Sequence, residues 1–191
     1  MKVPLYILGF LIKHGPQHGY KLKQVITEEV SRFAQIKQPT IYYHLERMAK
    51  NGLVTFKAEQ EGNRPERSVY RITRKGRTSF LEHLNNALKK RYVPEFILDA
   101  PLYFLKSLDT NKTIDALEKH AKTIDGMISE FLLYSTEVLL SLEGIDATMM
   151  RSILNHHIYH YQVELKWAHE TIKYLEKIRE DEKEEEIEQS I

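Results

Sequence analysis

The hydrophobic period of this chain changes at Asn51-Gly52, and this change constrains the fold more than any other feature of the sequence. Before it, apolar residues recur every three or four positions, which is the spacing of a helix that buries one face. Three short segments have this spacing and predict helices at residues 3–13, 20–33 and 39–51. Gly52 suits the position just after a helix, where a left-handed backbone is common, so we expect the third helix to end there.

The sequence that follows has the period of strands. Residues 53–60 and 68–73 are rich in β-branched and aromatic side chains, and the turn-forming residues between them predict a β-hairpin. A fourth helix is expected at residues 74–91, with Thr73 as its N-cap and Gly76 as a mild defect within it. Three helices followed by a hairpin are the order of a winged helix-turn-helix with a two-stranded wing, whose third helix enters the major groove.

The predicted third helix has an unusual exposed side. Its buried side is ordinary, because Ile41, Leu45 and Met48 recur at helical spacing. The other side combines hydroxyl groups with two cations, and its members are Thr40, Tyr42, Tyr43, Arg47 and Lys50. Chance is one explanation, since single exposed aromatic residues are normal. The other is contact with duplex DNA, where the cations reach guanine edges or phosphates and the hydroxyl groups reach phosphates.

The distribution of charge favours the second explanation. Residues 1–91 contain 18 Lys and Arg against 7 Asp and Glu, a net charge of +11. Residues 92–191 contain 10 against 20, a net charge of −10. A basic region attracts a polyanion and gains affinity through counterion release. Arg64 and Arg67 stand at or beside the tip of the predicted wing, where arginine suits a narrow minor groove.

Composition and motifs exclude several classes of protein. The absence of cysteine excludes disulfides, thiolate metal sites and cysteine nucleophiles. The first apolar run covers about ten residues, whereas a membrane span needs ~20, and it lacks a signal-peptide pattern. The sequence has no Gly-rich phosphate loop, no Ser/His/Asp arrangement and no H-E-x-x-H motif. We therefore expect a cytoplasmic protein that is not an enzyme, spans no membrane and uses no cofactor.

Several motifs of the basic half resemble the PadR family of transcriptional regulators over roughly residues 3–81. In order, they are a leading apolar helix, His-Gly-Tyr at 18–20, T-I-Y-x-x-L-x-x-M-x-x-x-G-L-V at 40–54 and NRPERSVYRITRKGRTSF at 63–80. The resemblance implies a dimeric repressor in which Thr40 and Tyr42 contact DNA and the basic wing residues contact its backbone. It also implies that Tyr20 packs at the first junction between helices and approaches the DNA backbone.

The acidic half is predicted to be entirely helical. Its apolar spacing predicts helices at residues 96–108, from Thr110 or Thr113 to 143, and at 147–182, followed by a frayed or disordered charged tail. The last helix carries a heptad repeat made of Leu154, Ile158, Tyr161, Leu165, Ala168, Ile172 and Leu175. Such a repeat indicates packing along another helix, either within one bundle or across a dimer interface. We favour the dimer, because DNA-binding proteins of this type are usually two-fold symmetric.

Two other patterns on the last helix suggest ligands. His156 and His160 are four residues apart and Glu164 extends their line, so they could chelate zinc or nickel. A complete site needs more ligands, however, and exposed histidines are more often solvated, so we assign no metal. Trp167 lies on one line with His160 and Tyr174, which could wall a pocket for a planar effector. Packing against the wing domain or a partner subunit is the alternative.

These features predict a mainly α (α+β) fold. Residues 1–91 are expected to form a winged helix-turn-helix DNA-binding domain, and residues 92–191 an all-α dimerisation domain. We expect a homodimeric regulator of transcription that binds an inverted repeat in double-stranded DNA, most simply a repressor that a small aromatic effector relieves. A winged-helix adaptor that binds only proteins and a metal-responsive regulator are the alternatives.

Overall fold

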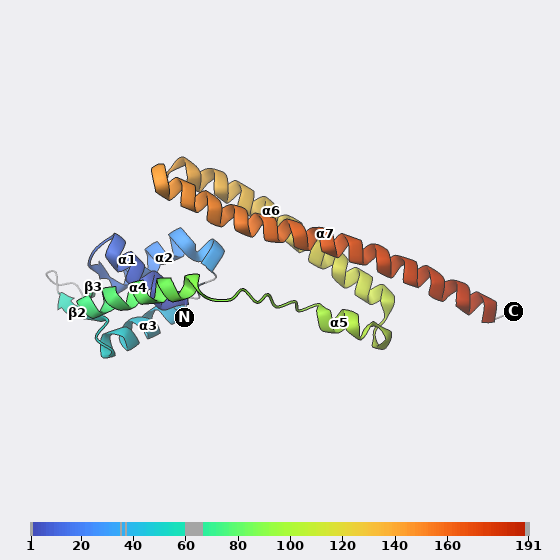
Figure 1. Ribbon diagram of the computed structural model, residues 1–191, viewed down its shortest axis with the longest axis horizontal. Helices are drawn as coiled ribbons and strands as arrows, with labels where there is room; N and C mark the ends of the chain where they lie inside the picture. The colour runs from blue at the N-terminus through green and yellow to red at the C-terminus, as the bar shows by residue number, and fades with distance from the viewer. Residues whose placement is uncertain (1, 35, 37, 60–66, 190–191) are drawn as a thin grey trace. The chain divides into compact units, whose positions relative to one another are not determined.

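The computed structural model describes residues 2–34, 36, 38–59 and 67–189 of the chain (Figure 1). The chain divides into two compact units, Met1–Val93 and Pro94–Ile191. The fold is mainly α with one small antiparallel sheet, as the sequence predicts. None of the helices within the described residues combines the length and the apolar character that crossing a membrane requires.

The described part of the first unit consists of four helices and the small sheet. Its helices are α1 (Lys2–Lys13), α2 (Gly19–Ala34), α3 (Gln38–Lys50) and α4 (Arg74–Leu88). Its strands are β1 (Gln17–His18), β2 (Val54–Glu59) and β3 (Arg67–Ile72). Three helices, a hairpin and a further helix follow one another as predicted, which is the order of a winged helix-turn-helix.

The sheet has one strand more than the sequence predicts. Its order is β1-β3-β2, and both pairs are antiparallel. β1 adds to β3 with Gln17 opposite Tyr70 and His18 opposite Val69. The predicted two-stranded wing is confirmed as the hairpin of β2 and β3, and β1 is a short additional strand that the sequence did not predict. A two-residue strand carries no alternating pattern, so only its pairing with a strand far along the chain defines it.

The core of the first unit is a single apolar cluster. α1 lies at its centre, because this helix contacts α2, α3, α4 and β3. The buried members are Ile7, Leu8, Phe10, Leu11, Leu22, Ile26, Val30, Ala34, Ile41, Leu45, Met48, Val54 and Ile72. A fully buried leucine or isoleucine contributes roughly 2 kcal/mol, so the buried face of α3 is firmly anchored and its other face is left for solvent.

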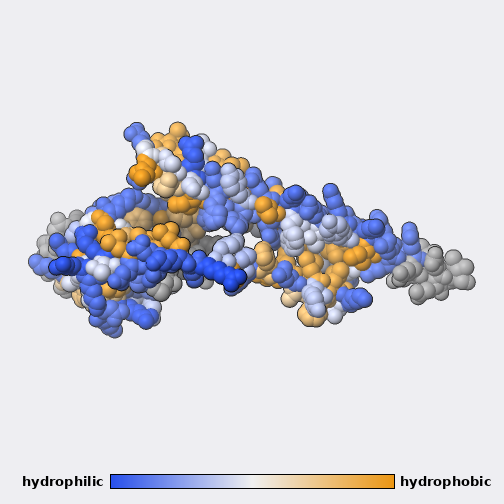
Figure 2. Space-filling model, viewed as in Figure 1, coloured by the Kyte–Doolittle hydropathy of each residue, from blue (hydrophilic) through white to orange (hydrophobic). Residues whose placement is uncertain are grey.

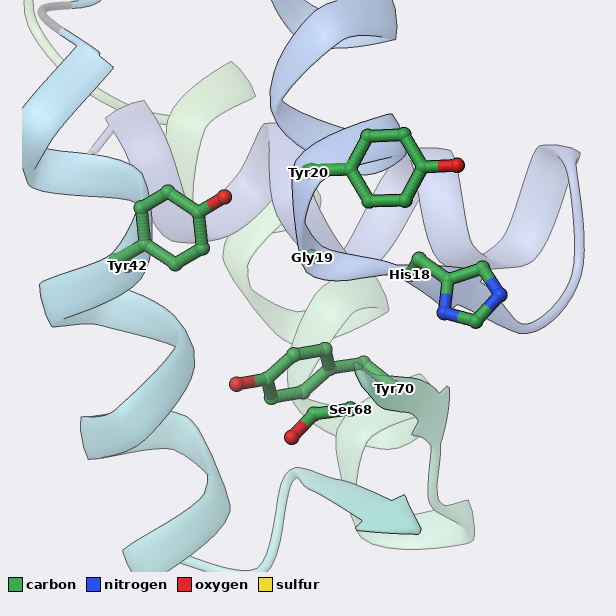
Figure 3. A pocket seen from close by; sticks show the side chains of 6 residues that line it. All are labelled: His18, Gly19, Tyr20, Tyr42, Ser68 and Tyr70. Atoms are coloured by element: carbon green, nitrogen blue, oxygen red, sulfur yellow. The ribbon is translucent and has the colours of Figure 1, made fainter. Parts of the chain in front are cut away.

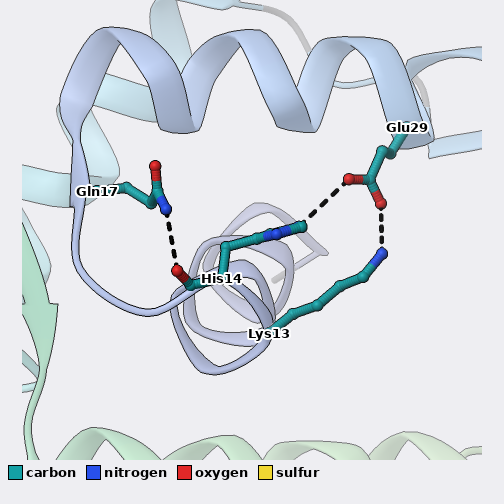
Figure 4. Close-up of polar contacts among 4 residues, drawn as sticks. All are labelled: Lys13, His14, Gln17 and Glu29. Atoms are coloured by element: carbon teal, nitrogen blue, oxygen red, sulfur yellow. Dashed lines mark hydrogen bonds and ion pairs between the residues drawn. The ribbon is translucent and has the colours of Figure 1, made fainter.

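The polar contacts between α1 and α2 centre on Glu29 (Figure 4). Its carboxylate pairs with the Nζ atom of Lys13 at 2.7 Å and with the Nε2 atom of His14 at 3.3 Å. The side-chain amide of Gln17 donates to the carbonyl of His14 at 3.0 Å. These contacts tie the C-terminal end of α1 to α2 and to the short strand between them.

The end of α3 has the conformation that Gly52 predicts. Gly52 has a φ of +68°, in the left-handed region where glycine is favoured. The N–H of Gly52 donates to the carbonyl of Ala49 at 3.0 Å, and the N–H of Leu53 donates to that of Met48 at 2.9 Å. These two bonds form a Schellman motif, which satisfies carbonyl groups at the end of the helix.

Gly76 is more than the mild defect predicted from the sequence. As expected, Thr73 caps α4, and its hydroxyl oxygen accepts a hydrogen bond from the N–H of Gly76 at 3.0 Å. A Cβ atom on Gly76 would overlap the carbonyl oxygen of Leu53 and lie 2.8 Å from the side chain of Ile72. A residue with a side chain would therefore force α4 away from the sheet.

The second unit is dominated by a helical hairpin. Its helical elements are α5 (Asp99–Tyr103), the 3₁₀ turn η1 (Leu105–Ser107), α6 (Thr110–Leu140) and α7 (Gly144–Gln189). α6 and α7 run antiparallel and pack along each other, and the turn between them uses Gly144 at a φ of +60° (Figure 1). Asp109 caps α6 by accepting a hydrogen bond from the N–H of Lys112 at 2.9 Å.

Two predicted elements of this unit are wrong in extent. The helix predicted at 96–108 is divided into α5 and η1, because Phe104 leaves the helical conformation. Tyr103 is 82% exposed, so little tertiary packing sustains a longer helix there. The charged tail is helical as far as Gln189, which contradicts the predicted fraying over 183–189. Its Glu and Lys residues are good helix formers.

The heptad repeat on α7 packs within the chain. Leu154 and Ile158 are buried, and Ile172 and Leu175 form a cluster with residues of α6. Leu154, Ile158, Ile172 and Leu175 are thus buried within their own chain, where α6 packs along α7, and their assignment to a dimer interface stays a prediction. Of the other assigned residues, Tyr161 and Leu165 are half-buried. The ring of Tyr161 packs edge-on against Phe131 of α6, with 5.5 Å between ring centroids.

Candidate nucleic-acid interface

The exposed side of α3 presents the polar stripe that the sequence predicts. Ile41, Leu45 and Met48 point into the core, which turns the opposite side of the helix to solvent. Tyr42 is 42% exposed and Tyr43 57% exposed. Arg47 and Lys50 are also exposed, and Thr40 is half-buried. The stripe has the donors that base edges and phosphates require.

Arg47 and Tyr43 act as a pair on this stripe. The Nη1 atom of Arg47 donates to the phenol oxygen of Tyr43 at 3.3 Å. The ring of Tyr43 in turn meets His44 edge-on at 5.2 Å. Burial, and then the charge of Arg47, hold the pKa of His44 below its usual value. His44 is thus favoured in its neutral form, which leaves Arg47 as the cation of this turn.

A pocket opens beside α3 where three other elements meet it (Figure 3). This tyrosine pocket has a volume of about 400 Å³. Its lining comes from β1, the start of α2, α3 and β3, and consists of His18, Gly19, Tyr20, Tyr42, Ser68 and Tyr70. Tyr20 and Tyr42 are among the site residues predicted from the sequence, whereas His18, Ser68 and Tyr70 are not. The strand period places Ser68 and Tyr70 on one face of β3, and this was the available indication.

The walls of the tyrosine pocket are closely packed at its base. A Cβ atom on Gly19 would lie 3.2 Å from the ring of Tyr42 and 3.2 Å from that of Tyr70, so glycine lets the two rings approach α2. Burial, followed by the nearby Glu46 and Tyr42, raises the pKa of Tyr70, while a hydrogen bond with Ser68 acts in the opposite direction. The phenol of Tyr70 is therefore protonated at neutral pH and is able to donate.

The wing carries further basic residues. Arg67 is the first residue of β3, and Arg64 lies outside the described residues. Lys57 on β2 and Arg71 on β3 are exposed. At the start of α4, the Nζ atom of Lys75 donates to the carbonyl of Asn51 at 3.0 Å. Lys57 and Arg71 lie on the face of the hairpin opposite to Ser68 and Tyr70, so the hairpin carries exposed positive charge on its other side from the tyrosine pocket.

Comparison with known proteins identifies this part of the chain. Residues 7–82 match the family described as the transcriptional regulator PadR-like family. This segment is a PadR-like domain. It includes α3, the tyrosine pocket and the described strands of the wing, so the features described above all lie in the PadR-like domain.

Relatives extend the similarity beyond the PadR-like domain. The negative transcriptional regulator PadR of Bacillus subtilis (strain 168) is 24% identical over 132 residues, which cover 68% of this chain and 71% of that protein. The crystal structure of Bacillus subtilis PadR in complex with operator DNA has a TM-score of 0.70 at 20% identity, covering 90% of this chain and 96% of that one. The complex with p-coumaric acid has a TM-score of 0.70 at 21% identity, covering 91% and 99%. At these identities the structures show a shared fold.

The structure brings together only two of the residues that the sequence suggests as ligands in the second unit. The Nε2 atoms of His156 and His160 are 3.0 Å apart, but Glu164 pairs with His120 of α6 at 3.1 Å. Within the described residues, no group of three or more His, Cys, Asp or Glu side chains is placed to hold a metal ion. Trp167 packs against the apolar cluster of α5, α6 and α7, whereas Tyr174 is 68% exposed.

A cavity of the second unit adjoins the cluster that contains Trp167. Its volume is about 340 Å³, and its walls come from α5 and the first turns of α6. Leu98, Leu102 and Leu117 line the cavity and also belong to the cluster against which Trp167 packs. Lys112 and His120 add polar groups to a mainly apolar wall. Such a wall suits a small molecule with an apolar ring and a polar end.

Proposed function

We propose that this chain is a transcriptional repressor whose PadR-like domain binds a specific sequence of double-stranded DNA through α3. The observation that carries the proposal is the exposed stripe of α3, where Tyr42, Tyr43, Arg47 and Lys50 lie opposite a fully buried apolar face. Its place in a region of net charge +11 supports a polyanionic partner. Bacillus subtilis PadR, which shares the fold, is known in complex with operator DNA.

Each residue of the stripe has a proposed role. α3 occupies the major groove, where Arg47 hydrogen-bonds a guanine edge and Tyr43 holds its guanidinium in position through their mutual hydrogen bond. Lys50 and Thr40 contact phosphates at the two ends of the helix, and the basic wing residues Arg64 and Arg67 contact the neighbouring backbone or the minor groove. Tyr20 approaches the backbone from the start of α2.

The second unit supplies the proposed dimer contact through surfaces that the hairpin leaves open. Large apolar side chains are exposed near the turn between α6 and α7, and Figure 2 shows hydrophobic side chains at this end of the hairpin. We call this the apolar tip surface and define it by Leu133, Leu140, Ile145, Met149 and Ile153. A second copy of the chain covers it in our proposal, and the symmetric dimer reads an inverted repeat.

The effector is proposed to be a small aromatic molecule. Bacillus subtilis PadR is known in complex with p-coumaric acid, and the cavity between α5 and α6 has a mainly apolar wall that suits a ring of this size. Trp167 packs on the same cluster, whereas His160 and Tyr174 contribute at most from the exposed side of α7. No catalytic step is part of this function, and it implies a location in the cytoplasm.

Selection of bound duplexes from a random DNA pool, at near-physiological salt, tests the proposal. Sequencing is expected to return an inverted repeat with half-sites about one helical turn apart. The lysine- and arginine-mediated contacts are expected to make binding weaken as salt is raised. Recovery of no preferred sequence would contradict a specific regulator and favour the protein-binding adaptor.

The effector is tested through tryptophan fluorescence. Trp167 is the chain's single tryptophan, so its emission reports on the second unit alone. Addition of p-coumaric acid is expected to quench this emission saturably and to release the selected DNA. Ala116 lines the cavity, and Ala116→Leu would fill part of it without adding a second fluorophore. This variant is expected to abolish the quenching. Quenching that Ala116→Leu leaves unchanged would place the effector elsewhere.

A further inference from the structure

The tyrosine pocket concentrates hydroxyl groups from separate elements. Tyr42 comes from α3, Ser68 and Tyr70 come from β3, and Tyr20 stands at the start of α2 (Figure 3). The rings of Tyr42 and Tyr70 converge over Gly19, each 3.2 Å from where its Cβ would lie. A pocket built only to be filled by packing would have apolar groups here, so this arrangement indicates a polar ligand.

The lining of the pocket defines the chemistry of that ligand. None of its six lining residues is Lys, Arg, Asp or Glu, so the ligand is held by neutral donors. Tyr70 is kept protonated, because burial and Glu46 raise its pKa. A free anion would have no cation to neutralise it there. An anion that is already held by neighbouring cations can occupy such a pocket, and a phosphate of a DNA backbone meets this condition.

We propose that the tyrosine pocket seats a single phosphodiester of the DNA backbone, with Tyr42 and Tyr70 as its hydroxyl donors and Ser68 supporting Tyr70 through their hydrogen bond. The inference rests on the proposed function and adds to it a phosphate site that joins the recognition helix to the wing. The volume of about 400 Å³ accommodates the phosphate together with parts of the flanking sugars. Tyr20 and His18, whose rings stack at 5.8 Å, form the rim on the side of α2.

This site would fix how deeply α3 enters the groove. A phosphate held from α3 by Tyr42 and from β3 by Tyr70 sets the position of the DNA strand against two elements at once. Because α3 begins its exposed stripe at this point, one phosphate then determines where Tyr43 and Arg47 meet the bases. The contact thus positions the bases without reading them.

Neutral donors predict a measurable signature. Counterions are released when cations neutralise phosphates, so loss of a Lys or Arg contact flattens the salt dependence of binding. A tyrosine hydroxyl carries no charge. Its removal is therefore expected to weaken binding by about the same factor at every salt concentration, and that factor is roughly 10-fold for a hydrogen bond to a charged group.

The test uses the full-length protein and the duplex that selection returns. Tyr42→Phe and Tyr70→Phe keep both rings and remove only the hydroxyl groups, and Ser68→Ala is a third, smaller change. Each tyrosine variant is expected to weaken binding by roughly 10-fold and Ser68→Ala by less, all with an unchanged slope of affinity against salt. Tyr103→Phe, on an exposed tyrosine of the second unit, is the matched control and is expected to have no effect.

Neutralised phosphates locate the contact. A methylphosphonate group replaces one backbone phosphate at a time. At one position in each half-site, this replacement is expected to weaken binding of the wild type. At the same position it is expected to have little further effect on the Tyr42→Phe/Tyr70→Phe double variant. Variants that bind like the wild type, or a double variant that still senses every substituted position, would overturn the phosphate site alone. Failure of the wild type to select any sequence would instead overturn the proposed function, and the phosphate site with it.

Discussion

The two units differ in how completely each one buries its own apolar side chains. The first unit closes a cluster of thirteen buried residues drawn from three helices and two strands. The second buries eleven apolar residues along α6 and α7, of which four join the α5–α7 cluster, although it contains the two longest helices of the described chain. Its exposed residues include Leu140 at 85% and Ile145 at 76%. Among the described residues, sixteen large apolar side chains are exposed in the second unit and ten in the first, so the second unit has the larger apolar surface available to a partner.

This difference separates two kinds of amphipathic helix. α3 leaves a polar stripe exposed because a polyanion is its proposed partner, and its affinity would depend on charge and hydrogen bonds. α6 and α7 leave apolar side chains exposed after their shared face is filled, and their affinity for a partner would depend on burial of apolar area. The net charges of +11 and −10 follow the same division. Four sets of substitutions test this difference between the two units.

Charges on the apolar tip surface should have the largest effect. Leu133→Glu combined with Ile145→Glu would place two unpaired carboxylates in the proposed dimer contact, which is expected to cost roughly 4 kcal/mol. Size-exclusion chromatography with light scattering should then give half the wild-type mass. Gln162→Glu, on an exposed part of α7 away from this surface, is the control. An unchanged mass for the double variant would show that the second unit does not associate through this end of the hairpin.

Replacement of a glycine by alanine should have opposite effects on stability in the two units. Gly76→Ala is expected to destabilise the first unit by ~3 kcal/mol, because its Cβ would overlap the carbonyl of Leu53. Gly126→Ala on α6 meets no neighbouring atom within 4 Å and is expected to stabilise that helix by about 0.5–1 kcal/mol. Thermal unfolding followed by circular dichroism measures both. A Gly76→Ala protein as stable as the wild type would contradict the close packing of α4 on Leu53.

Removal of an arginine should weaken DNA binding in the first unit but not in the second. Arg47→Ala is expected to weaken binding by ~1–3 kcal/mol and to relax the preference at one base position. Arg151→Ala, which removes an exposed arginine of α7, is expected to leave affinity and preference unchanged. Both are measured by repeating the duplex selection and by titration. If Arg47→Ala weakens binding equally on all sequences, Arg47 contacts a phosphate rather than a base.

The ion pairs between helices should contribute least. Glu29→Gln would remove the contacts of α2 with Lys13 and His14, and Glu164→Gln would remove the contact of α7 with His120. All of these side chains are partly exposed, so each change is expected to cost less than about 1 kcal/mol. Urea denaturation measures the loss. A cost above ~2 kcal/mol in either unit would indicate that the pair holds its two helices in register.

Local pattern was enough to predict most of the first unit. Ile41, Leu45 and Met48 identified the buried side of α3, and Gly52 identified its end, because both depend on neighbours within one or two turns. β1 could not be predicted, since its two residues become a strand only by pairing with β3. The close packing of Gly76 could not be predicted for the same reason, because the carbonyl group that it faces belongs to Leu53, outside its own helix.

The second unit shows the limit of a repeat pattern. The heptad repeat correctly indicated that α7 packs along another helix, but such a repeat does not specify which chain supplies that helix. Leu154 is fully buried by its own chain, so the repeat by itself accounts for packing within the hairpin and does not identify a dimer interface. The tyrosine pocket was only half found for a related reason, since Tyr42 and Tyr70 are brought together by the packing of α3 and β3 rather than by spacing.

Hydrogen bonds at Thr73 and Lys75 join the end of α3 to the start of α4. The hydroxyl of Thr73 donates to the carbonyl of Gly52 at 2.7 Å, its N–H donates to that of Leu53 at 3.1 Å, and Lys75 reaches Asn51 at 3.0 Å. The last turn of the recognition helix and the first turn of α4 are thus one rigid piece. Because these bonds join the two helix ends directly, a displacement of the first turn of α4 would be passed to the last turn of α3.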